Sequence, residues 1–152
     1  MELKDVIKDP VTIKAKASFK EAVALMIEKK TNVLLITDND NVLIGVVSVS
    51  DLLDAIVPEY LDGDSTAAHF ATEDMFKEAV QDTKDTPVSD FMSKELTTVS
   101  ENESLMAVAV TAIANKRLRI PVVDATGRPV GIISRQGLKH IVAEQLGIID
   151  SQ

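Results

Sequence analysis

The sequence predicts an α/β (α+β) fold made of two copies of one βαββα unit, with a helical insert between the copies. Residues 6–56 and 92–142 follow the same pattern at a constant distance of 86 positions, without a gap. A fixed shift that aligns a turn, a glycine and a helix cap indicates a real duplication. Identical aligned pairs include Thr12/Thr98, Ser18/Ser104, Ile27/Ile113, Lys30/Lys116, Asp38/Asp124, Gly45/Gly131, Ser48/Ser134 and Leu52/Leu138. Such a duplication creates a cleft between the copies.

The composition supports this fold class. Hydrophobic residues make up 45% of the chain and aromatic residues only 3%, which suits tightly packed layers of helices on sheets. A chain of 152 residues fits one domain or two fused half-domains, which bury about 70% of the surface that the unfolded chain exposes. We expect the first repeat at residues 1–57, a linker with a short helix at 58–87, the second repeat at 88–147 and a C-terminal tail at 148–152.

Each repeat is expected to open with a short strand that a helix follows. The strands are Val11–Ile13 in the first copy and Leu96–Val99 in the second. In the first copy, Ser18 and Glu21 are spaced as a capping box at the start of the helix. Each helix has one apolar face. It comprises Phe19, Ala22, Val23, Met26 and Ile27 in the first copy and Leu105, Val108, Ala109, Ala112 and Ile113 in the second.

Two further strands and a final helix complete each repeat. In the first copy, strands at Val33–Ile36 and Val42–Val47 are separated by residues 38–41, whose composition is typical of a hairpin turn. Residues 124–127 form the corresponding turn of the second copy. The final helices are expected at Asp51–Val57 and at Leu138–Leu146.

The linker differs from both repeats in composition. It is acidic and is broken at residues 62–64 before a helical pattern that Thr72 could cap. We expect this helix to pack on the domain, and a partner-binding role is the alternative. Its narrow apolar stripe consists of Met75, Phe76, Ala79 and Val80.

The charge of the chain restricts its partners. With 16 basic and 24 acidic residues, the formal net charge is −8, which repels nucleic acid and anionic membranes. Residues 1–14 lack the apolar core of a signal peptide, and no apolar run approaches the ~20 residues of a membrane span. A cytoplasmic protein without nucleic-acid or membrane partners is therefore expected. An anionic ligand would depend on local cations, for which the second repeat offers Lys116, Arg117, Arg119 and Arg135.

Conventional catalysis and metal binding find little support. With His69 in the linker, His140 near the C-terminus and no cysteine, neither a nucleophilic triad nor a His-rich metal site has its parts. Residues 38–40 resemble the start of a calcium loop, but Leu43 and Val49 stand where that loop needs glycine and glutamate. No standard phosphate-binding loop is present. We therefore expect no catalytic residues and no metal ligands.

The end of the last strand carries the most specific motif. Residues 45–51 read GVVSVSD, and in the second copy residues 119–124 (RIPVVD) are followed by GIIS at residues 131–134. Together with the duplication, these motifs resemble the cystathionine β-synthase (CBS) domain. The resemblance covers nearly the whole chain apart from the linker and tail. It implies tandem pseudo-twofold βαββα CBS repeats that form one Bateman module.

Asp51 is the best candidate for a ligand-binding residue. Negative charge is stabilised near a helix N-terminus, and the two carboxylate oxygens can accept hydrogen bonds from both hydroxyls of a ribose. Ser48 could donate to a ribose or phosphate oxygen, and the amides of Val49 and Ser50 lie beside the same helix start. The alternative is that Ser50 or Asp51 only caps the helix.

The resemblance implies that the other repeat completes this cleft. It places Thr97, Leu118 and Arg119 beside Ser48 and Asp51. Arg119 is the best candidate for a phosphate contact, because its planar guanidinium matches phosphate oxygens. The alternative is that Arg119 is an ordinary surface arginine.

The pseudo-symmetric second cleft departs from the motif. Gly137 replaces the ribose-binding aspartate, so this cleft lacks the acceptor for a diol. It is empty or uses Arg135 for a different anion. Its candidate residues are Val11, Asn32, Ser134 and Arg135.

The leading hypothesis is a free-standing, non-catalytic regulatory module that binds an adenosine-containing ligand. AMP, ADP or ATP would act as a regulatory ligand, and no cofactor is obligatory. The resemblance also implies a homodimer in which the terminal helices of each repeat pack against a second module, with an enzyme or transporter as the regulated partner. The alternatives are a protein-interaction module with vestigial clefts, a sensor of S-adenosylmethionine or a cyclic dinucleotide, and an enzyme.

Overall fold

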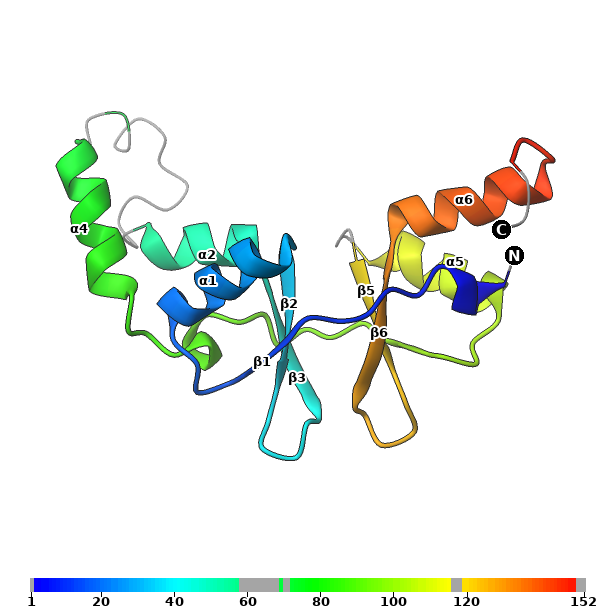
Figure 1. The fold of residues 1–152 in the computed structure, drawn as a ribbon, viewed down its shortest axis with the longest axis horizontal. Helices are drawn as coiled ribbons and strands as arrows, with labels where there is room; N and C mark the ends of the chain where they lie inside the picture. The colour runs from blue at the N-terminus through cyan, green and yellow to red at the C-terminus, as the bar shows by residue number, and fades with distance from the viewer. Residues whose placement is uncertain (1, 58–68, 70–71, 116–118, 150–152) are drawn as a thin grey trace. The chain divides into compact units, whose positions relative to one another are not determined.

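The structure is a computed structural model, which describes residues 2–57, 69, 72–115 and 119–149. These residues form two three-stranded sheets with helices packed on them (Figure 1). The elements of the first repeat are β1 (Thr12–Lys14), α1 (Phe19–Lys29), β2 (Val33–Thr37), β3 (Leu43–Ser48) and α2 (Val49–Ile56). Those of the second repeat are β4 (Val99–Ser100), α5 (Leu105–Ala114), β5 (Arg119–Val123), β6 (Pro129–Ser134) and α6 (Arg135–Gln145). Helix α4 (Glu73–Thr83) lies between the repeats in the chain.

The predicted βαββα order is confirmed in both repeats. Strand β1 runs parallel to β2, with Ile13 opposite Ile36, and β4 runs parallel to β5, with Val99 opposite Val122. In each sheet the middle strand is the second of the repeat. The mixed α/β fold that the duplication predicts is therefore present.

Several predicted boundaries are wrong by a few residues. Helix α2 begins at Val49 and α6 begins at Arg135, earlier than predicted, because Ser48 and Ser134 are the N-cap residues. Strand β4 contains only Val99 and Ser100, whereas the sequence predicted a strand from Leu96.

The core faces of the first helices are narrower than predicted. In α1, Phe19, Ala22 and Met26 are buried, as expected. Ile27 is 75% exposed, and its counterpart Ile113 in α5 is 86% exposed. The prediction is wrong at these two positions, because the buried residues of α1 follow an i, i+3, i+7 line and the next residue turns away from the sheet. Leu105 and Ala109, which the sequence also placed on the apolar face of α5, are exposed as well.

The residues group into two compact units that do not follow the repeats along the chain. The first unit contains Val11–Thr37 and Ile44–Lys94, and the second contains Met1–Pro10, Asp38–Leu43 and Glu95–Gln152. Each repeat is thus completed by the segment that precedes the other repeat. The repeat pattern of the sequence does not predict this exchange.

Backbone hydrogen bonds attach each of these segments to a sheet. The exchanged segments are Leu3–Lys8 and Val88–Ser93. In the second unit, Lys8 and Ile132 pair in the antiparallel sense through two N–H···O bonds of 2.9 Å. In the first unit, Val46 and Ser93 pair in the same way, with bonds of 3.0 and 2.9 Å. The third strand of each repeat therefore has a partner on its outer edge, which satisfies backbone groups that would otherwise be unpaired.

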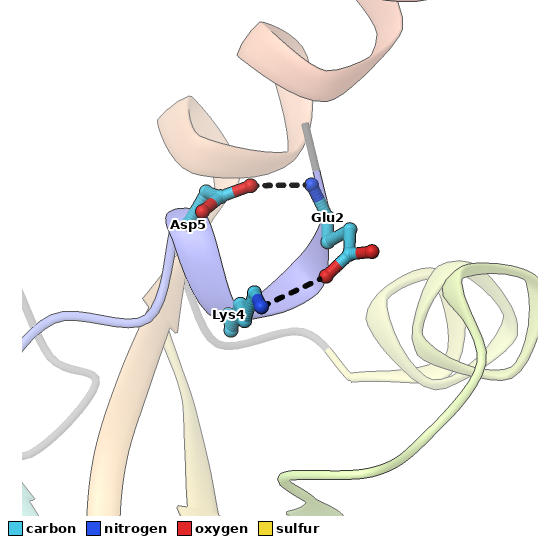
Figure 2. A network of polar contacts seen from close by, with 3 residues as sticks. All are labelled: Glu2, Lys4 and Asp5. Atoms are coloured by element: carbon cyan, nitrogen blue, oxygen red, sulfur yellow. Dashed lines mark hydrogen bonds and ion pairs between the residues drawn. The ribbon is translucent and has the colours of Figure 1, made fainter. Parts of the chain in front are cut away.

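A short 3₁₀ turn begins each exchanged segment. Turn η1 (Leu3–Asp5) buries Leu3 in the core of the second unit, and η3 (Val88–Asp90) buries Val88 in the core of the first. Figure 2 shows that the Asp5 carboxylate accepts a hydrogen bond of 2.6 Å from the amide of Glu2, and that Lys4 contacts the Glu2 side chain. The ion pair is exposed and contributes little, so the buried apolar side chains hold η1 in place.

Both hairpin turns are closed by an aspartate. The Asp38 carboxylate accepts hydrogen bonds from the amides of Asp40 and Val42, and Asp124 accepts them from Thr126 and Arg128. The hydroxyl and amide of Thr126 lower the pKa of Asp124 below its ordinary value.

Among the residues that the structure describes, no three His, Asp or Glu side chains gather into a metal-binding group.

The linker helix α4 packs against α2 within the first unit. The hydroxyl of Thr72 accepts a hydrogen bond from the amide of Met75, so Thr72 caps α4 as predicted. Ala79 and Val80 are partly buried, whereas Phe76 is 57% exposed. The predicted break at residues 62–64 lies outside the described residues. None of the described helices is long and apolar enough to cross a membrane.

The identical glycines Gly45 and Gly131 allow the exchanged segments to approach. A β-carbon on Gly131 would overlap with Ile7 Cγ2 and lie 3.2 Å from the carbonyl oxygen of Lys8. A β-carbon on Gly45 would lie 2.9 Å from Met92 Cγ. At these positions the sheet accepts its edge partner only if the side chain is absent.

We therefore expect Gly131→Ala to lower the free energy of unfolding by about 1–3 kcal/mol, as overpacking does. The double mutant with Ile7→Ala should lose less than the sum of the two single mutants, because Ile7→Ala removes the atom that the new methyl group meets. Urea unfolding of the four proteins measures this coupling. Additive losses would show that Ile7 does not set the requirement for glycine.

Candidate functional site

The strand-to-helix junction of the first repeat is held by a capping box. The Ser48 hydroxyl is the N-cap of α2 and accepts a hydrogen bond of 3.4 Å from the amide of Asp51. In return, Asp51 Oδ2 accepts hydrogen bonds of 2.7 Å from the Ser48 amide and 3.0 Å from the Ser48 hydroxyl. The two predicted site residues therefore fix each other at the end of β3.

This geometry decides which residue caps the helix. Ser50 lies inside the first turn of α2, so it is not the N-cap. Asp51 does contribute to the cap, as expected if its role were to cap the helix, but it does so only through Oδ2. Among the described residues, no donor bonds to its other oxygen, Oδ1. A carboxylate offers about four acceptor positions, so capping leaves Asp51 able to accept further hydrogen bonds.

Backbone donors accompany this carboxylate. Val49 and Ser50 are the first two residues of α2 and are exposed, and the first amides of a helix have no intrahelical acceptor. Donors and an acceptor thus lie together at one helix start. Such a site suits a polar ligand that has hydroxyl groups and anionic oxygens.

Two further residues of the predicted first cleft, Thr97 and Arg119, belong to the second unit. Thr97 is exposed just before β4, and Arg119 is the first residue of β5 and is partly buried. Leu118 lies outside the described residues. Ser48 and Asp51 belong to the first unit, so the cleft between the repeats stays a prediction.

The second unit brings together residues that the sequence analysis assigned to different clefts. Arg119 lies opposite Ser134 in the register of β5 and β6, and Arg135 follows as the exposed first residue of α6. None of the described acidic side chains forms an ion pair with either arginine. One end of this sheet therefore carries two cationic side chains beside a helix N-terminus.

The other candidates for the second cleft lie in the first unit. The carbonyl of Val11 accepts a hydrogen bond of 2.9 Å from the amide of Leu35, so it serves the junction of β1 and β2. Asn32 is exposed directly before β2. Neither position contradicts a role in ligand binding, which stays a prediction.

Gly137 makes the second helix start chemically different from the first. The Ser134 hydroxyl accepts a hydrogen bond of 3.2 Å from the Gly137 amide, but no side chain returns the bond as Asp51 does. A β-carbon on Gly137 would lie 3.0 Å from Val6 Cβ, a contact tighter than nearly all real ones. The missing carboxylate is therefore linked to the packing of Val6.

The constant shift of 86 residues does not reveal the exchanged segments, because their repeat distance differs from it by one residue. Leu3–Asp5 and Val88–Asp90 are 85 positions apart, whereas the rest of the repeat is shifted by 86. The signal that could have found them is the shared pattern of an apolar residue, any residue, Asp and two apolar residues in LKDVI and VSDFM.

The fold and the site define a class of protein: tandem βαββα repeats that present polar groups where the last strand meets the last helix. The CBS domain model matches residues 3–58 and 88–144. The chain therefore belongs to the CBS domain family and contains a pair of CBS domains. CBS pairs are generally regulatory modules rather than catalytic ones.

Among known proteins, the chain is similar to CBSX2, a chloroplast CBS domain-containing protein of Arabidopsis thaliana. The two are 32% identical over 132 residues, which cover 81% of this chain and 54% of CBSX2. The crystal structure of CBSX2 has a TM-score of 0.74, with 26% identity and 96% of each chain covered. CBSX2 in complex with AMP has a TM-score of 0.68, 26% identity, and coverage of 95% and 98%.

A second relative is the carnitine transport ATP-binding protein OpuCA of Listeria monocytogenes. It is 29% identical over 138 residues, which cover 91% of this chain but only 28% of OpuCA. The chain thus spans about half the length of CBSX2 and less than a third of OpuCA.

The capping box leads to a prediction about stability. Ser134→Ala should lower the free energy of unfolding by about 1 kcal/mol, and Ser48→Ala by up to about 2 kcal/mol, because Ser48 also holds the Asp51 carboxylate. Urea unfolding of both variants measures the difference. An equal or larger loss in Ser134→Ala would mean that Asp51 adds nothing to the cap.

Proposed function

We propose that this chain is a non-catalytic regulatory module that binds an adenosine-containing ligand at the start of α2. AMP, ADP or ATP is the simplest ligand, and no cofactor is obligatory. The observation that carries the proposal is the Asp51 carboxylate. Ser48 holds it in a fixed position through Oδ2, while no described residue donates to Oδ1.

Each proposed site residue has a role that its chemistry supports. Asp51 accepts hydrogen bonds from the ribose hydroxyls, and the amides of Val49 and Ser50 donate to the ligand. Arg119 binds phosphate, and its side chain has no acidic partner among the described residues. The resemblance adds Thr97 and Leu118 as further candidates, of which Leu118 lies outside the described residues.

The relatives support the ligand class and suggest a class of partner. CBSX2, with 26% identity, has been crystallised in complex with AMP. The similarity to OpuCA favours a transporter as a regulated partner. Ligand binding regulates such a partner only if the ligand binds two conformations of the module with different affinities.

Two alternative functions predict different results. An aspartate that binds ribose does not read the group attached at the 5′ position, so S-adenosylmethionine or a cyclic dinucleotide would use the same carboxylate. A protein-interaction module with vestigial clefts would bind its partner regardless of nucleotide. A ligand screen that includes all of these compounds separates these two alternatives from a sensor of adenine nucleotides.

We expect one adenosine compound to raise the melting temperature of the protein, since a ligand at a hundredfold excess over its Kd stabilises the native state by about 2.7 kcal/mol. The panel is adenosine, AMP, ADP, ATP, S-adenosylmethionine and cyclic dinucleotides. Asp51→Asn should weaken binding at least about tenfold, because a charge-assisted hydrogen bond is lost. The asparagine oxygen can still accept from the Ser48 amide, which keeps the capping box.

Asp54→Asn is the matched control, since it removes the same charge from an exposed position on α2. Equal binding by Asp51→Asn and the wild type in calorimetry would refute the role of Asp51. In the same titrations, Arg119→Gln should weaken AMP more than adenosine, and the exposed Lys139→Gln should change neither. Equal losses for AMP and adenosine would rule out a phosphate contact by Arg119.

We further propose that the module is a homodimer and that α5 faces the second copy. Helix α5 has no charged residue, and Met106, Val110 and Ile113 are 76%, 61% and 86% exposed. Val142 of α6 and Leu146, which follows the last residue of α6, are also exposed. In a chain with net charge −8, an uncharged helix is the surface where two copies meet without bringing acidic groups together. The exposed side chains thus favour a dimer interface formed by α5 and α6. The resemblance instead implied an interface formed by the terminal helices of the two repeats, α2 and α6.

Light scattering tests this proposal. The wild type should have twice the chain mass of 16.5 kDa, and Val110→Glu should have the mass of one chain, because it places a charge in the apolar interface. Lys29→Glu, at an exposed position of α1, is the control and should stay dimeric. A monomeric wild type would refute the proposal.

A further inference from the structure

Helices α2 and α4 carry most of the net charge of the chain. Their sequences contain six acidic residues and one basic residue, Lys77. Neither helix has a basic residue in its last turn. The two helices pack against each other in the first unit, so five of the eight net negative charges of the chain lie on two neighbouring helices. The acidic residues are Asp51, Asp54, Glu73, Asp74, Glu78 and Asp82.

The same two helices expose large apolar side chains. On α2, Leu53 is 52% exposed and Val57, which follows its last residue, is 41% exposed. On α4, Met75 is 42% and Phe76 is 57% exposed. No residue of α4 is buried. Contact with α2 therefore uses only part of the apolar stripe, and the end that contains Phe76 stays open.

Acidic and apolar side chains alternate along the same helical lines. Asp54 precedes Val57 by three positions, Glu73 precedes Phe76 by three, and Glu78 follows Met75 by three. Residues three positions apart are neighbours on a helix surface. Val57, Met75 and Phe76 thus each have a carboxylate at this spacing, whereas Leu53 does not.

This combination determines the chemistry of the partner. An apolar face without charge would suit a second copy of the chain, as α5 does. A face with excess negative charge repels anionic membranes, nucleic acid and another copy of itself. Apolar anchors flanked by carboxylates match a segment that has apolar residues and lysine or arginine at helical spacing.

We propose that the surface formed by Leu53, Val57, Met75 and Phe76 with the flanking carboxylates binds a cationic amphipathic segment of a partner protein. This proposal does not depend on nucleotide binding. It makes the α2–α4 surface a docking site that is separate from the ligand site at the start of α2.

The test uses the full chain without nucleotide and a synthetic amphipathic peptide of leucine and lysine in helical heptads. Binding is measured by fluorescence anisotropy. The control peptide has glutamate in place of lysine. We expect the lysine peptide to bind at least about tenfold more tightly than the glutamate peptide. Equal affinities would overturn the charge complementarity.

Two pairs of variants locate the peptide. The double mutant Leu53→Ser/Phe76→Ser should weaken binding at least about tenfold, whereas Ile27→Ser, at an exposed position of α1, should not change it. The double mutant Glu78→Lys/Asp82→Lys should also weaken binding, compared with Glu95→Lys/Glu101→Lys. The second pair changes the net charge of the chain by the same amount at exposed positions of the other unit.

Three results would overturn the proposal. Equal losses in the two lysine double mutants would mean that the peptide responds only to total charge. Unchanged binding in Leu53→Ser/Phe76→Ser would remove the apolar anchors. A change of molecular mass in that double mutant, by light scattering, would assign the surface to contact between copies. All variants replace exposed residues, and circular dichroism of each variant tests whether it is folded.

Discussion

The edge pairing between each sheet and the segment that precedes the other repeat is the interaction on which the rest of the structure depends. Lys8 pairs with Ile132 and Ser93 pairs with Val46, so the third strand of each repeat has no open edge. The pairing requires Gly45 and Gly131, because a side chain there would meet the incoming segment. It also inserts Leu3 or Val88 into a core. The duplication alone therefore does not describe a folding unit, since each repeat needs residues from outside itself.

This packing also explains why the two helix starts differ. In the second unit, Val6 lies so close to Gly137 that a β-carbon would be only 3.0 Å away. In the first unit, Asp51 occupies the equivalent position and closes a capping box with Ser48. An aspartate at 137 would need Val6 to move, which would disturb the contact that holds η1. The asymmetry of the two sites thus follows from apolar packing as well as from the loss of a carboxylate.

The sequence could predict the features that depend on local pattern. The fixed shift of 86 residues, the hairpin aspartates and the serine caps all depend on short-range chemistry, and the structure contains them. It could not predict the edge pairing, because the exchanged segments are aligned at 85 and their hydrogen bonds join distant parts of the chain. It was also wrong about Ile27 and Ile113, since an apolar residue at the edge of a helical face can point outward. The role of Asp51 in the cap depends on which carboxylate oxygen accepts the hydrogen bonds from Ser48. The sequence carries no information on the choice between the two oxygens.

Helix α2 is the element through which the proposed activities can influence one another. Its first turn contains Asp51, which the ligand would contact, and the apolar side chains of Leu53 and Val57 lie two and six residues further along the chain. The helix is only eight residues long, and isolated helices of this length are marginal, so its order depends on the cap and on α4. A ligand that binds Asp51 would order the same helix that presents the anchors to a partner. By thermodynamic linkage, a partner that orders α2 would then raise the affinity for the ligand by the same factor. Coupling between the two sites therefore needs no movement of one unit relative to the other.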